Sequence, residues 1–280
     1  MMALVASDID GTLCIRSNLT HTASDHGLAA HTVDRWQGGS AVTTFSGARA
    51  WGRLATSKCL IPATTRTMLQ YRRLRWPGPT PEWAVILNGA HILWRGAVEP
   101  SWSNTCTRHA RECGWDARHA AALLKEHLAT CFLTDVSPGF FVKSHGVTPP
   151  TSREVAELRE VARSHHMVCS VQSRSVYLSP RSLGKREALE WIAERAGPIQ
   201  ASAGDSAQDV TMLQWSPRAI CPRKSEACAE VADTSVSVVD GEPIDQVTSI
   251  AKWLEIQSLE SGRRSSSLHS RVHPDISPIH

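Results

Sequence analysis

Two carboxylates stand one residue apart near the amino terminus, in the stretch Ser7-Asp8-Ile9-Asp10-Gly11-Thr12-Leu13. The apolar run before them, residues 3–7, predicts a buried strand. Ligands of open α/β sheets bind at the carboxyl ends of the strands, where both acids would lie. One carboxylate there can act as a nucleophile and the other can transfer protons. A bare Asp-x-Asp pair could equally be a solvated turn, but the Gly-Thr continuation after an apolar strand favours a site.

Three further segments place polar side chains at the end of a predicted strand or the start of a predicted helix. Thr64-Thr65-Arg66 follows the apolar run 59–63, and Lys185 opens an amphipathic stretch. Asp205 and Asp209 follow the run 199–203 and share a face if a helix begins there, because they are four residues apart. The alternative for this last pair is a helix-start acid with a solvated neighbour. The Gly-Asp-Ser context makes that alternative the weaker one.

These four segments, in this order, resemble the four motifs of the haloacid dehalogenase (HAD) superfamily of hydrolases. The position of the inserted region and the stretch Asn88-Gly89-Ala90 are similar to the subgroup with a large α/β cap, which includes sucrose-phosphate and mannosylglycerate-phosphate phosphatases. The run from Thr64 to Arg73 also resembles HAD proteins of tellurium-resistance clusters. One departure is Thr65, which stands where many members with sugar-phosphate substrates have glycine.

The resemblance implies a magnesium-dependent phosphatase that acts on a small phosphorylated metabolite such as a sugar phosphate. Asp8 would form an aspartyl phosphate, Asp10 would serve as acid and base, and Thr64 and Lys185 would hold the phosphoryl oxygens. Oxygen ligands for Mg²⁺ would come from four residues: Asp8, Asp10 through its carbonyl, Asp205 and Asp209.

Substrate contacts are expected from residues beside the motifs and from the inserted region: Gly11, Thr12, Thr65, Arg66, Asn88 and Arg174. Arg174 is included among these contacts because it falls at a predicted hairpin tip. The alternative is that its charge faces solvent. Two other functions stay open, namely phosphoryl transfer between hydroxyls, as in phosphomannomutases, and binding without turnover.

Short apolar runs alternate with helical patterns, which predicts a parallel sheet with helices on both faces. The predicted strands are residues 3–7, 59–63, 85–87, 199–203, 219–221 and 236–239. Pro62 argues against a central position for the second of them. Apolar stripes predict helices over residues 184–196 and around residues 244–254. The fold class is therefore α/β, a Rossmann-like parallel sheet with an inserted α+β cap.

The pattern changes between residues 89 and 180, which we assign to the cap, while residues 1–88 and 181–258 form the core. Thr151 and Glu154 form a capping-box signature for a cap helix. We expect residues 259–280 to be disordered because they lack an apolar face. The stretch from Cys14 to Gly39 is weakly patterned. Of the arginines at 66, 72, 73 and 75, only Arg66 is expected at the site, and the others on a solvated face.

Bulk properties narrow the class of partner. The net charge is +3, from 30 Lys and Arg against 27 Asp and Glu, which is too mild to indicate nucleic acid or a membrane surface. Eight scattered cysteines without a CxxC pair predict reduced, mostly buried thiols rather than disulfides or a zinc site near Cys106, His109 and Cys113. No apolar run resembles a signal peptide or a membrane span. These features predict a cytoplasmic protein, and the sequence leaves its oligomeric state open.

Overall fold

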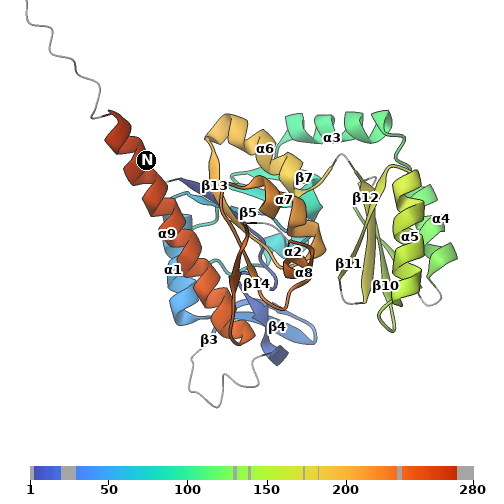
Figure 1. The fold of residues 1–280 in the computed structure, drawn as a ribbon, viewed down its shortest axis with the longest axis horizontal. Coiled ribbons are helices and arrows are strands. Elements are labelled where there is room, and N and C mark those ends of the chain that lie inside the picture. Colours follow the sequence, from blue (N-terminus) through green and yellow to red (C-terminus); the bar gives the residue numbers. More distant parts are fainter. Residues whose placement is uncertain are drawn as a thin grey trace, which may run out of the picture.

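A five-stranded parallel sheet forms the centre of the protein (Figure 1). The structure is a computed structural model that describes residues 3–19, 30–128, 131–137, 140–172, 174–181, 183–231 and 235–269. The strand order is β15 (Ser237–Val239), β14 (Ala219–Pro222), β13 (Ile199–Ala203), β1 (Leu4–Ser7) and β5 (Leu60–Pro62). All five lie where the sequence predicts them. The sixth predicted strand is β6 (Trp83–Ile86).

Pro62 ends the outermost strand of this sheet, where a missing backbone donor is tolerated. Its neighbour Ala63 donates to the Ser7 carbonyl at 2.8 Å and forms a parallel bridge with Val85. That bridge joins the sheet to a second, antiparallel one made of β6, β7 (His91–Trp94) and β8 (Ala97–Val98).

Helices cover both faces of the central sheet. Val5 and Leu60 pack with Leu54 of α1 (Phe45–Thr56) and Leu254 of α9 (Pro243–His269). On the other face, Ala6 and Ile61 pack with α6 (Lys185–Ala196), α7 (Val210–Trp215) and α3 (Pro100–Glu112). The two clusters use alternate residues of β1, because successive side chains of a strand point to opposite faces. The predicted stripe of α9, from Ile244 to Leu254, is buried. The short α8 (Glu226–Glu230) follows β14.

α9 continues as far as His269, beyond residue 259, where the sequence predicts a disordered tail. Its packed first half supplies the helix nucleus, and each further residue then adds one backbone hydrogen bond. The interval holds no proline to stop the helix. The rest of the expected tail, residues 270–280, lies outside the described residues.

The weakly patterned stretch after the first motif forms a small antiparallel sheet in its described part. We call this sheet the flap; it contains β2 (Ile15–Arg16), β3 (Ala30–Trp36) and β4 (Gly39–Thr44), in the order β2-β4-β3. A single turn, η1 (Ser17–Leu19), follows β2. The ladder of β3 is irregular between Thr32 and Asp34, so both Val33 and Asp34 are buried. A bulge of this kind hides a strand from a strict two-residue period.

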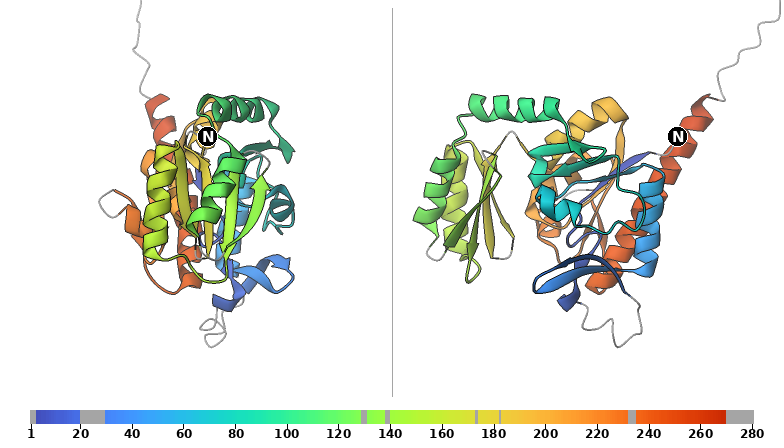
Figure 2. Two further views of the ribbon diagram at one scale, coloured as in Figure 1. Left: turned by 90° about the vertical axis from the view of Figure 1, so that its right-hand side faces the viewer. Right: turned by 180° about the vertical axis from the view of Figure 1, so that it is seen from behind.

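The cap is a four-stranded antiparallel sheet with two helices on its outer face (Figure 2). The strand order is β11 (Met167–Gln172), β12 (Ser175–Pro180), β10 (Phe141–Gly146) and β9 (Cys131–Ser137). Residues of α4 (Ala117–His127) and α5 (Ser152–Ser164) pack on Val142, Val176 and Leu178. The predicted capping box of Thr151 and Glu154 is present at the start of α5.

The connection into the cap packs with the core rather than with the cap helices. Ile92 of β7 and both Trp102 and Cys106 of α3 belong to the core cluster around Ala6 and Ile61. The separate cap core starts near Trp115. The change in packing therefore lies well after residue 89, the predicted boundary. None of the helices in the described part of the chain combines the length and the apolar character that a membrane crossing requires.

Candidate active site

Three neighbouring strands end at one edge of the central sheet and bring the predicted motifs together. β1 lies between β5 and β13, so Asp8, Thr64 and Asp205 emerge side by side from their carboxyl ends. The Asp8 amide donates to the Ala203 carbonyl at 2.9 Å, which fixes the start of the first loop against β13. Because parallel strands share this edge, residues far apart in sequence meet there.

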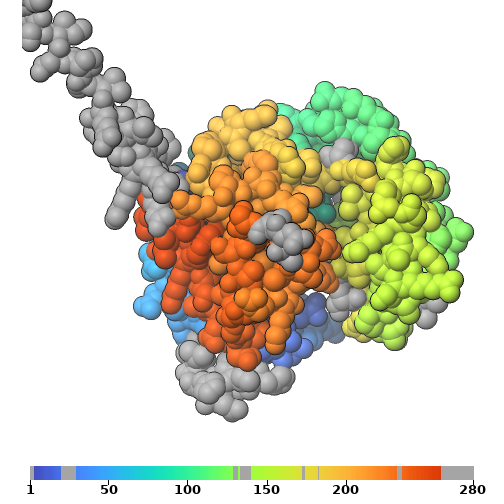
Figure 3. All heavy atoms as spheres, viewed as in Figure 1, coloured from blue at the N-terminus to red at the C-terminus, as the bar shows by residue number. Residues whose placement is uncertain are grey.

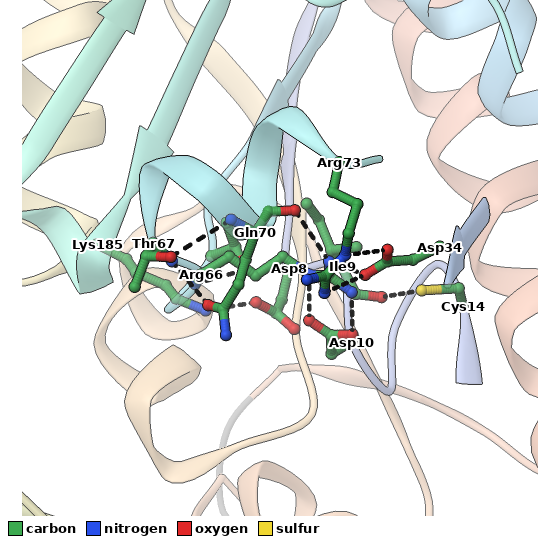
Figure 4. Close-up of polar contacts among 11 residues, drawn as sticks. Asp8, Ile9, Asp10, Cys14, Asp34, Arg66, Thr67, Gln70, Arg73 and Lys185 are labelled. Atoms are coloured by element: carbon green, nitrogen blue, oxygen red, sulfur yellow. Dashed lines mark hydrogen bonds and ion pairs between the residues drawn. The ribbon is translucent and has the colours of Figure 1, made fainter. Parts of the chain in front are cut away.

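Lys185 reaches this edge from the first turn of α6. Its side chain is fully buried, and its ammonium group donates to Asp8 Oδ1 at 2.7 Å (Figure 4). The same ammonium group donates to Asp209 Oδ1 at 2.6 Å. A close backbone contact places this turn: Gly89 has a φ of +100°, and a Cβ there would lie 2.1 Å from the Gly184 carbonyl oxygen. Only glycine allows that approach. Gly89, in the turn η2 (Leu87–Gly89), therefore helps to set the position of Lys185.

Gly11 and Thr12 contact Asp205 directly. The Thr12 hydroxyl donates to Asp205 Oδ1 at 3.2 Å. A Cβ on Gly11, whose φ is +83°, would lie 2.1 Å from Asp205 Oδ2. Both residues were predicted as substrate contacts, and the structure places them against the Asp205 carboxylate.

Asp209 is buried, and its carboxylate already has several donors. Besides Lys185, Ser206 donates to Oδ2 through its amide at 3.0 Å and its hydroxyl at 2.8 Å, and the Asp205 amide donates at 3.2 Å. These bonds cap the turn η3 (Ala207–Asp209). Asp209 is thus committed to holding Lys185 and the loop of Asp205.

The donor set fits a divalent cation. Carboxylate oxygens of Asp8, Asp205 and Asp209 lie within 4.8 Å of one another. Burial raises the pKa of Asp8 to about 7, with Asp209 and Asp10 adding to the rise and Lys185 opposing it. Burial and the charges of Asp8 and Asp209 likewise raise the pKa of Asp205 well above its ordinary value. Hard oxygen ligands with uncompensated negative charge are what Mg²⁺ requires.

This electrostatic arrangement predicts a coupling between pH and Mg²⁺ in thermal stability. Because the folded protein binds the Asp8 proton more tightly than the unfolded chain does, the contribution of Asp8 to stability falls as pH rises from its ordinary pKa of 3.8 to about 7. Mg²⁺ offsets that loss, so it should raise the melting temperature more at about pH 8 than at about pH 5. Scanning fluorimetry with EDTA or Mg²⁺ measures both. An equal effect of Mg²⁺ at the two pH values would contradict the assignment.

The Asp10 side chain, next to this cluster, forms a two-pronged ion pair with Arg66. Arg66 Nε donates to Asp10 Oδ2 and Nη2 donates to Asp10 Oδ1, both at 2.7 Å (Figure 4). Nη1 of Arg66 donates to Asp34 Oδ2 at 2.6 Å and to the Gln70 carbonyl at 3.3 Å. Arg66 was predicted as a substrate contact, yet most of its donors are engaged within the protein.

Asp34 is the residue of this site that sequence reasoning missed. It is fully buried in β3 and also accepts bonds from Arg73, at 2.7 Å to Oδ1 and 3.0 Å to Oδ2. Arg73 is exposed, as predicted and like Arg72 and Arg75, but it also forms this ion pair with the buried Asp34. The surrounding sequence of β3 mixes polar and apolar residues and gave no local signal for a buried acid.

The other predicted contacts differ in their distance from the site. Thr64 is buried, and its hydroxyl accepts from the Arg66 amide at 3.2 Å, while Thr65 is half-buried beside it. The Asn88 amide donates to the Thr64 carbonyl at 3.0 Å, so Asn88 adjoins the second motif. Arg174 is exposed, and its guanidinium donates to the Val147 carbonyl at 3.3 Å. That contact lies within the cap, and no contact of Arg174 with the site is seen among the described residues.

The zinc alternative near Cys106 has no support in the described part of the chain. Cys106 is buried in the core cluster, and the Cys113 thiol donates to the Ala110 carbonyl. Every cysteine with a described side chain is a free thiol. Among the described residues, the acidic group at the sheet edge is the cluster that could hold a metal ion.

Neither a protein-family model nor a curated protein sequence matches this chain. Solved structures do match its fold. A Synechocystis sucrose-phosphatase in complex with sucrose and phosphate aligns with a TM-score of 0.61 and 14% identity, over 89% of this chain and 97% of that chain. A haloacid dehalogenase-like hydrolase from B. subtilis gives 0.54 and 14%, over 90% and 99%.

A trehalose-6-phosphate phosphatase related protein gives a TM-score of 0.52 and 16% identity, over 92% of this chain and 100% of that chain. Identities this low show the fold. This result agrees with the predicted α/β core and inserted cap, whereas the predicted likeness to proteins of tellurium-resistance clusters stays a prediction.

Proposed function

We propose, starting from the fold that this chain shares with haloacid dehalogenase-type phosphatases, that it is a magnesium-dependent phosphomonoesterase. The observation that carries the proposal is the buried Lys185 ammonium between Asp8 and Asp209, with Asp205 beside them. A phosphate ester repels an anionic nucleophile. Here the Lys185 ammonium, together with a cation held by the carboxylates, would offset the negative charges of Asp8 and of the ester.

The proposed reaction has two steps with the same two carboxylates. An oxygen of Asp8 attacks phosphorus, the bond from phosphorus to the leaving oxygen breaks, and protonated Asp10 gives its proton to that oxygen. Asp10 then takes a proton from water as the water oxygen attacks phosphorus, and the bond to Asp8 breaks. Phosphate is released, the Asp8 carboxylate is restored, and Asp10 carries its proton again. Asp10 can serve both steps because its side chain is 45% exposed beside the buried nucleophile.

Positive charge and hydrogen-bond donors at the sheet edge would hold the phosphoryl group. Lys185 contacts Asp8 and would also contact the phosphoryl oxygens. The Thr64 hydroxyl would donate to another phosphoryl oxygen. Mg²⁺, when held by Asp8, Asp205, Asp209 and the Asp10 carbonyl, would neutralise phosphoryl charge in the transition state. The Asp205 carboxylate accepts one bond, from Thr12, whereas that of Asp209 accepts four, so we assign Asp205 a larger share of the metal affinity than Asp209.

A cavity of about 290 Å³ between cap and core supports a polyol leaving group, as in a sugar phosphate. In the space-filling view the yellow-green cap lies against the orange part of the core (Figure 3). Asn88, Gly184 and Gln208, which adjoin the catalytic motifs, line this cavity together with Ser170 of the cap. Asn88 Oδ1 and Gln208 Oε1 are buried and have no partner among the described residues. Polar side chains in the lining, such as those of Asn88, Gln208 and Ser170, suit the hydroxyl groups of a sugar. A metabolite phosphatase of this kind is expected in the cytoplasm.

A phosphate-release screen over phosphorylated metabolites, with Mg²⁺ or EDTA, tests the proposal. We expect Mg²⁺-dependent release from at least one sugar phosphate. Transfer of phosphate to a second sugar without net release would instead support the mutase alternative. Binding of Mg²⁺ without release or transfer across the panel would support a binding protein and contradict the phosphatase.

Asp205→Asn and Asp209→Asn are expected to separate metal binding from structure. Asp205→Asn should weaken the Mg²⁺ dependence of activity by at least about 10-fold with little change in melting temperature. Asp209→Asn should instead destabilise the fold by about 1–3 kcal/mol, since the amide turns a donor toward Lys185 or Ser206. Mg²⁺ titrations of activity and thermal denaturation measure the two effects. The same profile for both variants would contradict this division of roles.

A further inference from the structure

A buried ion-pair network links the flap to the Asp10 carboxylate. Asp34 lies at its centre, with a fully buried side chain, and receives bonds from both Arg66 and Arg73. Burial alone would raise the pKa of Asp34, but the hydrogen bonds from Arg73 and Arg66 hold it below its ordinary value. Asp34 is thus a fixed negative charge, with no exposed surface of its own and in contact with two cations.

Arg66 connects Asp34 to Asp10, because its guanidinium donates to both carboxylates. One edge of the planar guanidinium, Nε and Nη2, donates to the two Asp10 oxygens, each at 2.7 Å. The Nη1 atom donates to Asp34 at 2.6 Å. Because a guanidinium is flat and its donors are fixed relative to one another, the bond to Asp34 sets the plane in which Asp10 is held. The Asp10 side chain is still 45% exposed despite this contact, so it stays accessible to a substrate oxygen.

We infer that Asp34 is a positioning residue for proton transfer: it fixes Arg66, and Arg66 orients the Asp10 carboxylate toward the leaving oxygen. This inference rests on the proposed acid and base role of Asp10. It assigns to the flap a function in the chemistry, since β3 carries Asp34 and no other described flap residue contacts Arg66 by a hydrogen bond.

The inference predicts an effect that depends on the leaving group. Proton donation matters most when the leaving oxygen is a poor one, such as the alkoxide of a sugar, and matters little for 4-nitrophenolate, which leaves without a proton. Asp34→Asn keeps the size of the side chain but loses one oxygen acceptor and the charge. Its kcat should fall about 10–100-fold for glucose 6-phosphate and less than about 3-fold for 4-nitrophenyl phosphate.

Two variants strengthen this comparison. Arg66→Lys retains a positive charge without the two-pronged contact, so it should show the same selective loss for glucose 6-phosphate. Asp240→Asn removes an exposed ion pair with Arg223, on the surface, and should leave both rates unchanged. Equal losses for the two esters in Asp34→Asn and in Arg66→Lys would overturn the inference, because a purely structural role has no reason to distinguish leaving groups.

Crystal structures of the wild type and of Asp34→Asn give a readout that does not require turnover. We expect the Asp10 carboxylate to leave its two-pronged contact with Arg66 in the variant. Asp10 found in the wild-type orientation would overturn the inference. Absence of phosphate release from both esters by the wild type would instead count against the proposed function, and the crystal structures would still decide the role of Asp34.

Discussion

Asp8→Asn is expected to abolish phosphate release, with kcat reduced by at least about 10³-fold. The amide is nearly the same size as the carboxylate but is a poor nucleophile, so the aspartyl phosphate cannot form. The fold should survive, because the introduced amide oxygen can still accept a bond from Lys185 and the mutual repulsion among Asp8, Asp205 and Asp209 is relieved. Steady-state kinetics with Mg²⁺ and thermal denaturation measure these two effects.

The matched control for this substitution is Asp240→Asn, the same chemical change in an exposed ion pair with Arg223, after the outermost strand β15 and outside the acidic cluster. It should retain full activity. Mass spectrometry of acid-quenched wild-type enzyme should place the phosphoryl group on the peptide that contains Asp8. A phosphoryl group on serine or histidine, or substantial activity in Asp8→Asn, would show that the nucleophile lies elsewhere.

Lys185→Met is expected to lose both activity and stability. The ammonium group is buried between Asp8 and Asp209, and methionine leaves these two carboxylates without their shared cation. Removing one partner of a buried ion pair costs about 3–5 kcal/mol. Activity should fall by at least about 10²-fold because a charge that stabilises the transferring phosphoryl group is absent. Chemical denaturation and kinetics measure the losses.

The pH dependence of the Lys185→Met defect distinguishes charge from packing. Burial would lower the pKa of Lys185, but Asp209 and Asp8 outweigh burial and raise it, so the ammonium stays charged through the neutral range. Without that charge the carboxylates are stable only when protonated, so the variant should lose more stability at about pH 8 than at about pH 5. Lys252→Met, an exposed helical lysine of α9, is the control. A loss independent of pH would indicate a packing defect instead.

Local sequence was sufficient to identify the strands and helices that carry the proposed site. Apolar runs that end in Asp8 and Ala203 and the stripe that begins at Lys185 are local patterns, and burial on one face of a strand or helix imposes them. The capping box at Thr151 and the edge position expected from Pro62 follow from backbone donors that must be satisfied or are missing. These features depend on neighbouring residues only, so they were readable before the fold was known.

Local sequence patterns did not predict the strands of the flap or its ion pairs. The irregular ladder near Asp34 breaks the two-residue period, and the ion pair of the exposed Arg73 with Asp34 is seen only when β3 is placed beside it. Likewise, only the packed α9 shows that helix continues to His269.

The sequence by itself determined which residue types stand at the strand ends and which faces are apolar, because local backbone and burial preferences act within a few residues. The tertiary structure alone decided which charges meet: Lys185 with Asp8 and Asp209, Gly11 with Asp205, and Arg66 between Asp10 and Asp34. A buried charge is tolerated only beside a partner, and that partner can come from any part of the chain.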